Sequence, residues 1–194
     1  MRYDEDHKSK THKKIVKMAS RQIRGKGLAG PAIPTLMKAS GLTHGGFYKH
    51  FASRNNLIVE AVEESFRELT DTFLKAATKS DSPEGWRGMV KAYLSLERCD
   101  KIDTGCPIAA LAPEIARAES SIKSRSVLAI IKFRQDILPF MPGNNASEKE
   151  ENFFIIMSSM AGAVIIARTI PDPKVREGIL SSVQNFLLDR FSSF

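Results

Sequence analysis

Apolar residues recur at intervals of three and four along most of the 194-residue chain, which is the spacing of one face of an α-helix. Near the start this spacing is followed by Ile15, Met18, Ala19 and Ile23, and further along it is followed by a stripe from Ile58 to Phe73. No segment shows the strict alternation of apolar and polar residues that indicates a half-buried strand. The sequence therefore predicts an all-α fold of about nine helices, with three short helices at the N-terminal end and six in a larger body.

Capping residues and prolines set the expected helix boundaries. Ser53 is a suitable N-cap for the long helix that follows it. Pro107 suits a first helical turn, but Pro113 disrupts the next one, so residues 107–117 are expected to be irregular. A regular helix is expected over residues 119–138.

The segment of residues 147–169 is apolar on nearly every side of the helix that it predicts. Ser147 is the expected N-cap, with Glu148 and Glu150 in the positive first turn. A helix without a polar face is buried on both sides. It can lie between the core of its own subunit and a partner subunit, or it can be the central helix of a monomer.

The composition favours an ordinary globular protein of the cytoplasm. No run reaches the roughly 20 apolar residues that a membrane span needs, and the N-terminal residues lack the apolar segment of a secretory signal. Two cysteines, Cys99 and Cys106, are too few for a disulfide framework, so both thiols are expected to be reduced. No membrane partner is expected.

Charge is distributed unevenly along the chain. Residues 8–56 contain eleven Lys or Arg and no Asp or Glu. Residues 1–56 carry a net charge of +9, with twelve basic and three acidic residues, and residues 57–194 carry −2. The first part is therefore expected to bind a polyanion, whereas the second part is not.

Within this acid-free stretch, a short helix is expected near residues 33–40 and a second one over about 43–50, with Gly41 in the turn between them. Two short helices joined by a glycine turn are typical of a helix-turn-helix that reads the major groove of DNA. Gly45 and Gly46 weaken the second helix by roughly 0.5–1 kcal/mol each. Their absent side chains would let the helix end approach the groove closely.

The segment "GLTHGGFYKHFASRNNLIVEAV" resembles the DNA-binding signature of the TetR family of transcriptional regulators. The resemblance covers about residues 10–65 and implies a helix-turn-helix DNA-binding domain in residues 1–56. It also implies a ligand-binding and dimerisation domain in residues 57–194. The segment "TGCPIAALAPEIA" is similar to one found at the same relative place in some members of the family.

The resemblance assigns roles within the motif. It implies that Thr43 contacts a phosphate or a base edge, that Tyr48 binds a phosphate, and that Phe47 and Phe51 hold the element in the core. The chain departs from the family where Ala32 replaces a common Ser or Thr cap. The implied DNA-contact set is Thr35, Thr43, His44, Gly45, Gly46, Tyr48, Lys49, His50, Arg54 and Asn55.

The resemblance further implies a homodimer in which the last two long helices of each subunit form a four-helix bundle. Small residues near the middle of residues 147–169 would allow two such helices to approach closely. The expected dimer contacts are Ala161, Gly162, Ile166, Val183, Phe186 and Leu187.

A pocket for a small, largely apolar, aromatic or electrophilic inducer is expected in the larger domain, where Met and aromatic side chains suit an adaptable apolar site. Plain core packing is the alternative for each of them. The candidate pocket residues are Trp86, Met89, Tyr93, Cys106, Phe133, Phe154, Met157 and Met160.

Cys106 precedes Pro107 at an expected helix start, where the positive helix end can lower the pKa of a thiol. A redox or electrophile sensor acting through Cys106 is one interpretation, and an inert core thiol is the other. A disulfide between Cys99 and Cys106 is left undetermined by the sequence.

An enzyme is disfavoured. All four histidines lie within residues 7–50, and the chain has no HExxH, no CxxC, no phosphate-binding loop and no evident nucleophile with a base. No metal or cofactor is expected. The favoured hypothesis is a repressor that leaves its double-stranded operator DNA when a small-molecule inducer binds. A DNA-binding regulator without small-molecule input is the alternative.

Overall fold

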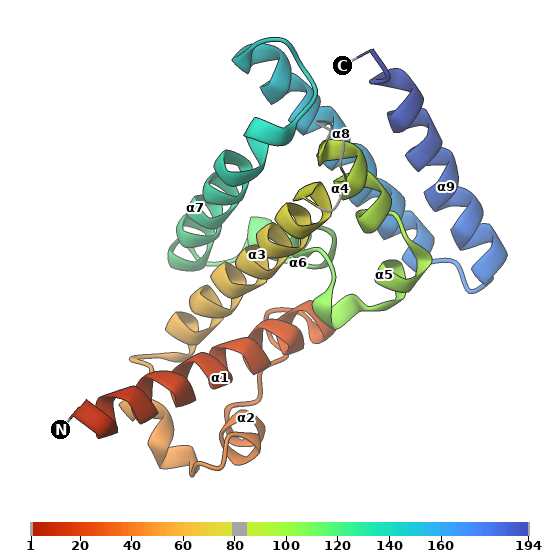
Figure 1. The fold of residues 1–194 in the computed structure, drawn as a ribbon. Coiled ribbons are helices and arrows are strands. Elements are labelled where there is room, and N and C mark those ends of the chain that lie inside the picture. Colours follow the sequence, from red (N-terminus) through yellow and green to blue (C-terminus); the bar gives the residue numbers. More distant parts are fainter. Residues whose placement is uncertain (1, 79–84, 194) are drawn as a thin grey trace.

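The computed structural model describes residues 2–78 and 85–193, and this part of the chain is helical throughout. It contains nine α-helices and three 3-10 helices and no strand, which confirms the predicted all-α fold (Figure 1). The elements in chain order are α1 (Arg2–Lys26), α2 (Ile33–Ala39), η1 (His44–Lys49), α3 (Arg54–Thr78), α4 (Gly85–Tyr93), α5 (Leu96–Asp100), η2 (Ile102–Thr104), α6 (Pro107–Arg117), α7 (Ser120–Ile137), η3 (Leu138–Phe140), α8 (Ala146–Arg168) and α9 (Pro173–Arg190).

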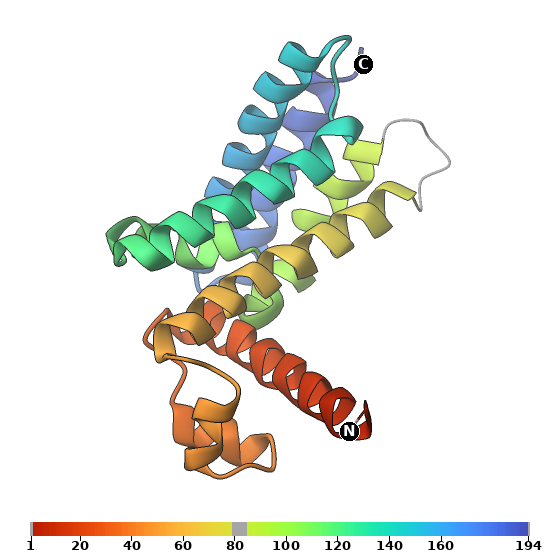
Figure 2. The same ribbon diagram turned by 90° about the vertical axis from the view of Figure 1, so that its left-hand side faces the viewer.

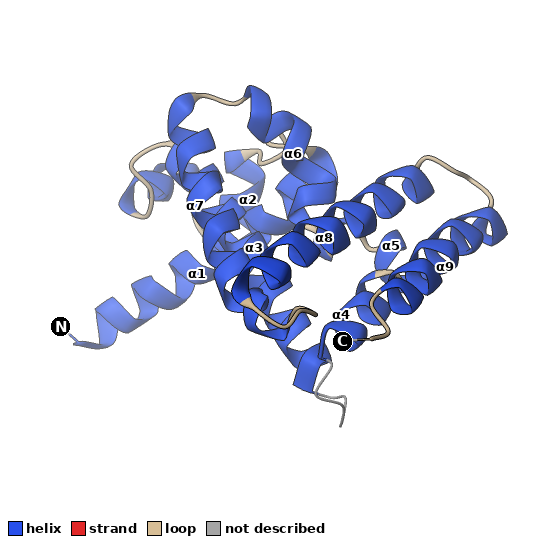
Figure 3. Ribbon diagram, turned by 90° about the horizontal axis from the view of Figure 1, so that it is seen from above, coloured by secondary structure: helices blue, strands red, loops and turns tan. Residues whose placement is uncertain are grey.

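The long helix α3 connects the N-terminal elements to the larger body. It packs against α1 at its beginning and against α7 along its length (Figures 1 and 2). Helices α8 and α9 pack side by side at the opposite edge of the molecule, as Figure 3 shows from above. The N-terminal helix α1 has 25 residues, so the expectation of three short helices at this end was wrong for the first of them.

The predicted start of α3 is confirmed. The helix begins at Arg54, and the backbone amide of Asn56 donates to the Ser53 hydroxyl at 3.1 Å. On the buried side of α3, Phe66 and Phe73 pack against Phe133 of α7, with ring centroids 6.0 and 5.7 Å apart. Aromatic pairs of this kind contribute about 0.5–1.5 kcal/mol beyond the burial of their area.

Residues 107–117 form the regular helix α6, so the expectation of an irregular segment was wrong. Pro107 occupies the first turn as expected, and Pro113 lies inside the helix on its exposed side. An interior proline costs about 3 kcal/mol. Leu111 and Ile115 lie one turn apart and are both buried, and burial of two such side chains provides about 3–6 kcal/mol. Burial of this face therefore offsets the cost of the proline.

The apolar segment forms helix α8, but its cap differs from the expected one. The backbone amide of Glu148 donates to Oδ1 of Asn145 at 3.0 Å, so Asn145 caps the helix and Ser147 does not. Within the described residues, α8 is long and apolar enough to cross a membrane by length and composition, but 44% of its most apolar window is buried within the fold. One side of α8 faces the core, and the other side exposes apolar residues, which are Phe154, Ile155, Ile165 and Ile166.

Candidate nucleic-acid interface

A glycine turn ends α2 and positions the element that follows. Gly41 has a φ of +77°, in the left-handed region that favours glycine. Its backbone amide donates to the Lys38 carbonyl at 3.0 Å, and the Leu42 amide donates to the Met37 carbonyl at 2.8 Å. These two hydrogen bonds form a Schellman motif. The sequence "SGL" therefore ends α2 at a defined angle.

The second element of the motif is the 3-10 helix η1, within the residues expected to form a short helix. Phe47 and Phe51 are both buried, with their rings stacked at a centroid distance of 5.3 Å. The Phe51 amide donates to the Phe47 carbonyl at 3.0 Å. All six residues of η1 follow the tighter 3-10 geometry, which is longer than the usual run of three or four. Its position is thus fixed by two aromatic side chains.

The opposite side of η1 is open to solvent. Tyr48 is 69% exposed, and its ring packs edge-on against Phe47 at 5.2 Å. Thr43 is the N-cap of η1 and is exposed, and its side chain makes no capping hydrogen bond. Lys49 and, on α2, Thr35 are exposed as well. Hydroxyl and ammonium groups therefore lie free on this surface, whereas the side chain of His44 lies outside the described part of the structure.

The fold does not require glycine at either position of the Gly45–Gly46 pair. A Cβ atom at Gly45 would meet nothing within 4 Å. At Gly46 it would make ordinary contacts, the nearest with Cε of Met37 at 3.7 Å. Neither glycine has a positive φ. The interior of this subunit thus gives no reason for the two glycines.

His50 lies between η1 and α1 and is partly buried. Its buried Nδ1 has no hydrogen-bond partner, and its ring centroid is 6.1 Å from that of His12. Burial lowers the pKa of His50, and the nearby His12 and Lys8 lower it further. His12 in turn contacts Glu60 of α3, with Nε2 and Oε2 2.5 Å apart. His50 therefore joins η1 to the inner surface of α1.

Arg54 and Asn55 make contacts within the subunit. The Arg54 guanidinium donates to the carbonyls of Leu28 and Ala29 at 3.0 and 3.1 Å. The Asn55 side-chain amide donates to the carboxylate of Glu119 at 2.8 Å. In this structure the two residues connect the start of α3 to the loop after α1 and to the start of α7.

Most of the basic residues in the acid-free stretch are free for an outside partner. Nine of the eleven are exposed, whereas Arg54 is partly buried and Arg24 is fully enclosed. Long basic side chains that remain in water attract a polyanion over the whole surface of α1, α2 and η1. The exposed set is Lys8, Lys10, Lys13, Lys14, Lys17, Arg21, Lys26, Lys38 and Lys49.

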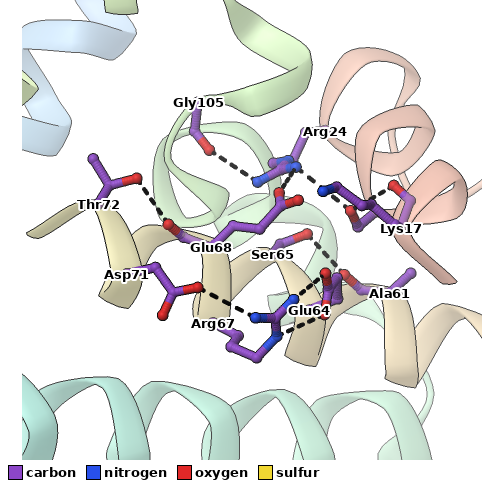
Figure 4. Close-up of polar contacts among 11 residues, drawn as sticks. Lys17, Arg24, Ala61, Glu64, Ser65, Arg67, Glu68, Asp71, Thr72 and Gly105 are labelled. Atoms are coloured by element: carbon purple, nitrogen blue, oxygen red, sulfur yellow. Dashed lines mark hydrogen bonds and ion pairs between the residues drawn. The ribbon is translucent and has the colours of Figure 1, made fainter. Parts of the chain in front are cut away.

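Arg24 links α1 to the body of the protein, as Figure 4 shows. Its guanidinium lies 2.5 Å from the carboxylate of Glu68 on α3 and donates to the Gly105 carbonyl at 3.4 Å. A second link joins the Leu28 amide to the carboxylate of Glu114 on α6 at 2.8 Å. The sequence analysis missed these residues, because contacts between positions 44 to 86 apart leave no local pattern.

Most of the candidate pocket residues are side chains of the core in this structure. Seven of them are buried side chains of the core, whereas Phe154 is 53% exposed on α8. A groove of about 1480 Å³ lies between α1, α3 and α7, and of the candidate residues only Phe133 lines it. The seven buried candidates are Trp86, Met89, Tyr93, Cys106, Phe133, Met157 and Met160.

Both cysteines are buried free thiols. Cys106 is the N-cap of α6, but burial raises the pKa of its thiol. Hydrogen bonding to the Tyr93 hydroxyl and to the amides of Ala109 and Ile108 lowers this pKa, but by less than burial raises it. Burial therefore outweighs the effect of the helix end on the pKa of this thiol. Burial also raises the pKa of Cys99.

The expected dimer residues fall into two groups. The first group is open to solvent: Ile166 and Phe186 are exposed, and Val183 and Gly162 are partly exposed. A Cβ atom added at Gly162 would meet nothing within 4 Å. Ala161 and Leu187 point into the subunit and are buried. Of the large apolar residues that the described part of the chain exposes, six lie on α8 and α9, namely Phe154, Ile155, Ile165, Ile166, Val175 and Phe186.

No protein-family model matches the chain, and no curated protein matches it in sequence. Several solved structures have a similar fold. A TetR transcriptional regulator from Chloroflexus aurantiacus is 20% identical, with a TM-score of 0.74 over 94% of this chain and 96% of that one. A TetR-family regulator from Cytophaga hutchinsonii is 15% identical, with a TM-score of 0.75 and the same coverage of both chains.

The fold is also similar to that of the superantigen PfiT, at 15% identity, a TM-score of 0.60 and coverage of 92% of this chain and 94% of that one. Likeness at these levels of identity establishes architecture, and function has to be argued from the residues of the site. This chain therefore has the fold of TetR-family transcriptional regulators, with an N-terminal helix-turn-helix, the central α3 and the paired α8 and α9.

Proposed function

We propose that the protein is a cytoplasmic DNA-binding transcriptional regulator that acts as a homodimer. Residues 1–56 form the DNA-binding unit, and residues 57–194 form the ligand-binding and dimerisation unit. The observation that carries the proposal is the combination of nine exposed cations within residues 8–56, no acidic residue in that stretch, and the open face of η1.

The exposed groups divide into two kinds of contact. Lys49 and the Tyr48 hydroxyl reach phosphates, which fix the protein on the duplex without reading its sequence. Thr43 at the start of η1 reaches a base edge, and Gly45 allows close approach because no side chain stands between the backbone and the groove. Arg54 and Asn55 fix the start of α3, which follows η1 in the chain, through their contacts within the subunit.

The second subunit covers the apolar surface of α8 and α9. Ile166 and Phe186 lie on this surface at 56% and 61% exposure, and Gly162 leaves room for a neighbouring helix. Large apolar surfaces of this kind mark interfaces between proteins. A homodimer places two copies of η1 on two half-sites about one helical turn of DNA apart.

Ligand binding in the larger unit releases the repressor from DNA. The ligand prefers a conformation of the dimer in which the distance between the two copies of η1 no longer fits the two half-sites of the operator. The links from Arg24 to Gly105 and from Leu28 to Glu114 support this coupling, since they join α1 and the loop after it to α6 and the residue just before its N-cap. The buried, neutral Cys106 favours an inert thiol over a redox sensor. The second candidate is a regulator without small-molecule input, since seven of the eight candidate pocket residues are buried side chains of the core.

The test is selection of bound fragments from the genome of the source organism, followed by fluorescence anisotropy with the selected sequence and a scrambled duplex at fixed salt. We expect specific binding that weakens about 10³- to 10⁵-fold between 50 and 200 mM salt if six to ten phosphates are contacted. Lys49→Ala should weaken binding and reduce the salt slope, whereas Lys91→Ala on the exposed side of α4 should not. Equal binding to both duplexes by every variant would contradict the proposal.

A further inference from the structure

The groove between α1, α3 and α7 is large and open to solvent. Figure 2 shows α3 running between the other two helices, so that α3 lies along the groove and α1 and α7 flank it. Its volume of about 1480 Å³ exceeds the roughly 300–1,000 Å³ of a pocket for a small molecule. A segment of another macromolecule therefore fits the groove better than a small ligand does.

One side of the groove is apolar. Val16 of α1, Leu74 of α3 and Leu128 of α7 line it, and Leu128 is 58% exposed. Val127 and Ile131 extend the exposed apolar surface along α7. Outside α8 and α9, the described part of the chain exposes five large apolar side chains, and three of them are these residues of α7. An exposed apolar cluster of this kind indicates a contact with another molecule.

The charged residues along the groove are paired with one another except on α1. The pairs are His12 with Glu60, Glu63 with Arg125, Arg67 with Glu64 and Asp71, and Lys132 with Asp136. The exceptions are Lys13, Lys14 and Lys17, which line the groove, are exposed and form no ion pair with a described residue. The groove therefore combines an apolar side with three cations that lack an anion.

These three lysines repel one another, because Lys13 and Lys17 lie one turn apart on α1 and Lys14 lies three residues before Lys17. Carboxylates from an occupant of the groove relieve this repulsion, and charge complementarity of this kind selects and orients a partner. An α-helix can present apolar side chains on one face and carboxylates along its edge, and it has a diameter of about 10–12 Å. Amphipathic helices bind to other proteins in such grooves.

We propose that this groove binds an amphipathic helix of another protein, with apolar side chains against α3 and α7 and with Asp or Glu along the edge that faces α1. The phosphates of DNA also match the lysines, but they do not cover an apolar surface such as that of Leu128. The bound helix neutralises Lys13, Lys14 and Lys17, which belong to the nine exposed cations that we assign to DNA. The partner therefore competes with the operator. This competition rests on the proposed function, whereas binding of the helix does not.

The experiment selects 18-residue peptides from a display library against the full chain in the absence of DNA, and then measures binding of the labelled peptides by fluorescence anisotropy. We expect enriched peptides with a net negative charge and with apolar residues at the i, i+3, i+4 and i+7 positions. Leu128→Glu should weaken their binding about 10- to 100-fold. Ile102→Glu is the matched control, since Ile102 is 42% exposed on η2 outside the groove, and it should bind the peptides normally.

A charge reversal tests the lysines separately. Lys13→Glu combined with Lys17→Glu should weaken binding of the acidic peptide about 10-fold and should favour a version in which Lys replaces each Asp and Glu. Lys91→Glu, on the exposed side of α4, should change neither. Saturating acidic peptide should lower the affinity of the parent chain for the operator, and the version with Lys should not.

Several results would overturn the inference. They are a selection that enriches no acidic amphipathic peptide, peptide binding that Leu128→Glu and the double lysine variant leave unchanged, and operator affinity that saturating peptide leaves unchanged. If no peptide is enriched, loss of operator binding by the double lysine variant would assign these lysines to DNA alone. Laurate binding that Leu128→Glu removes would in that case assign the groove to a small amphiphile, and dissociation of the dimer by Leu128→Glu would assign it to a second copy of the chain.

The peptide titrations contain no DNA, so their failure would leave the proposed function standing. Failure of the unmodified chain to bind any selected duplex would refute the proposed function instead.

Discussion

The guanidinium of Arg24 and the carboxylate of Glu68 form an ion pair 2.5 Å long between α1 and α3, with the arginine side chain fully enclosed. The pair lies where the basic N-terminal elements meet the body. A second nitrogen of the same guanidinium donates a hydrogen bond to the Gly105 carbonyl. A buried charge of this kind is tolerated only while its partners are present. The orientation of α1 relative to the body therefore depends on a small number of atoms.

Glu68→Gln should destabilise the protein, because it leaves Arg24 enclosed and without its counter-charge. The expected loss is about 3 kcal/mol in the free energy of unfolding, measured by urea denaturation. Arg67→Ala is the control, since Arg67 is 60% exposed and its pairs with Glu64 and Asp71 should contribute about 0–1 kcal/mol. Equal losses for the two variants would show that the enclosed pair has no special role.

Gly45→Ala should separate folding from DNA binding. The added Cβ meets nothing within 4 Å, so the free protein should become more stable by about 0.5–1 kcal/mol in thermal or urea unfolding. Operator affinity in the anisotropy assay should fall, because the methyl group stands between η1 and the groove. Ser121→Ala on the exposed side of α7 is the control and should leave operator affinity unchanged. Unchanged affinity for Gly45→Ala would place η1 away from the DNA.

Thr43 and Tyr48 should differ in the kind of defect that their substitution causes. Tyr48→Phe retains the ring that packs on Phe47 and removes only the exposed hydroxyl, so it should weaken binding to every duplex by a similar factor. Thr43→Ala should also reduce the difference in affinity between the operator and altered duplexes, and His44→Ala should do the same. The expected reduction in binding free energy is about 1–3 kcal/mol for each hydrogen bond to a base that the substitution removes. If Tyr48→Phe combined with Lys49→Ala binds the operator with unchanged affinity, η1 is not the recognition element.

His50 should make stability depend on pH below neutrality. Burial and the nearby His12 and Lys8 hold its pKa in the folded state below the usual value of 6.5. The unfolded chain therefore binds the proton more readily, and the stability that neutral His50 provides is present above pH 6.5 and lost as the pH falls through the folded-state pKa. Urea midpoints between pH 7.5 and 5.5 should decline for the parent chain and decline less for His50→Gln. Parallel pH profiles for the two chains would exclude His50 as the source.

Local signals explain which features could be predicted from sequence. Helix spacing, the Ser53 cap and the burial of Phe47 and Phe51 are encoded within a few residues, and the structure confirms them. Pro113 misled the prediction because the local cost of a proline was weighed without the burial of the α6 face against the rest of the fold.

Contacts distant in sequence could not be predicted in this way. The partner of Arg24 stands 44 positions away, and the partner of the Leu28 amide stands 86 positions away. The sequence also left open whether Cys106 is a reactive or an inert thiol, because the burial that raises its pKa depends on helices from elsewhere in the chain.

Phe186→Glu should convert the protein to a monomer. Phe186 is 61% exposed on α9, within the apolar surface that we assign to the partner subunit, and a buried carboxylate there would lack a counter-charge. Sedimentation velocity should show a single-chain mass, and operator affinity should fall because one subunit contacts only one half-site. Leu128→Glu is the matched control, since Leu128 is 58% exposed but lies on α7 away from that surface. If the Leu128 variant dissociates and the Phe186 variant remains a dimer, the interface lies on α7 and the assignment to α8 and α9 is wrong.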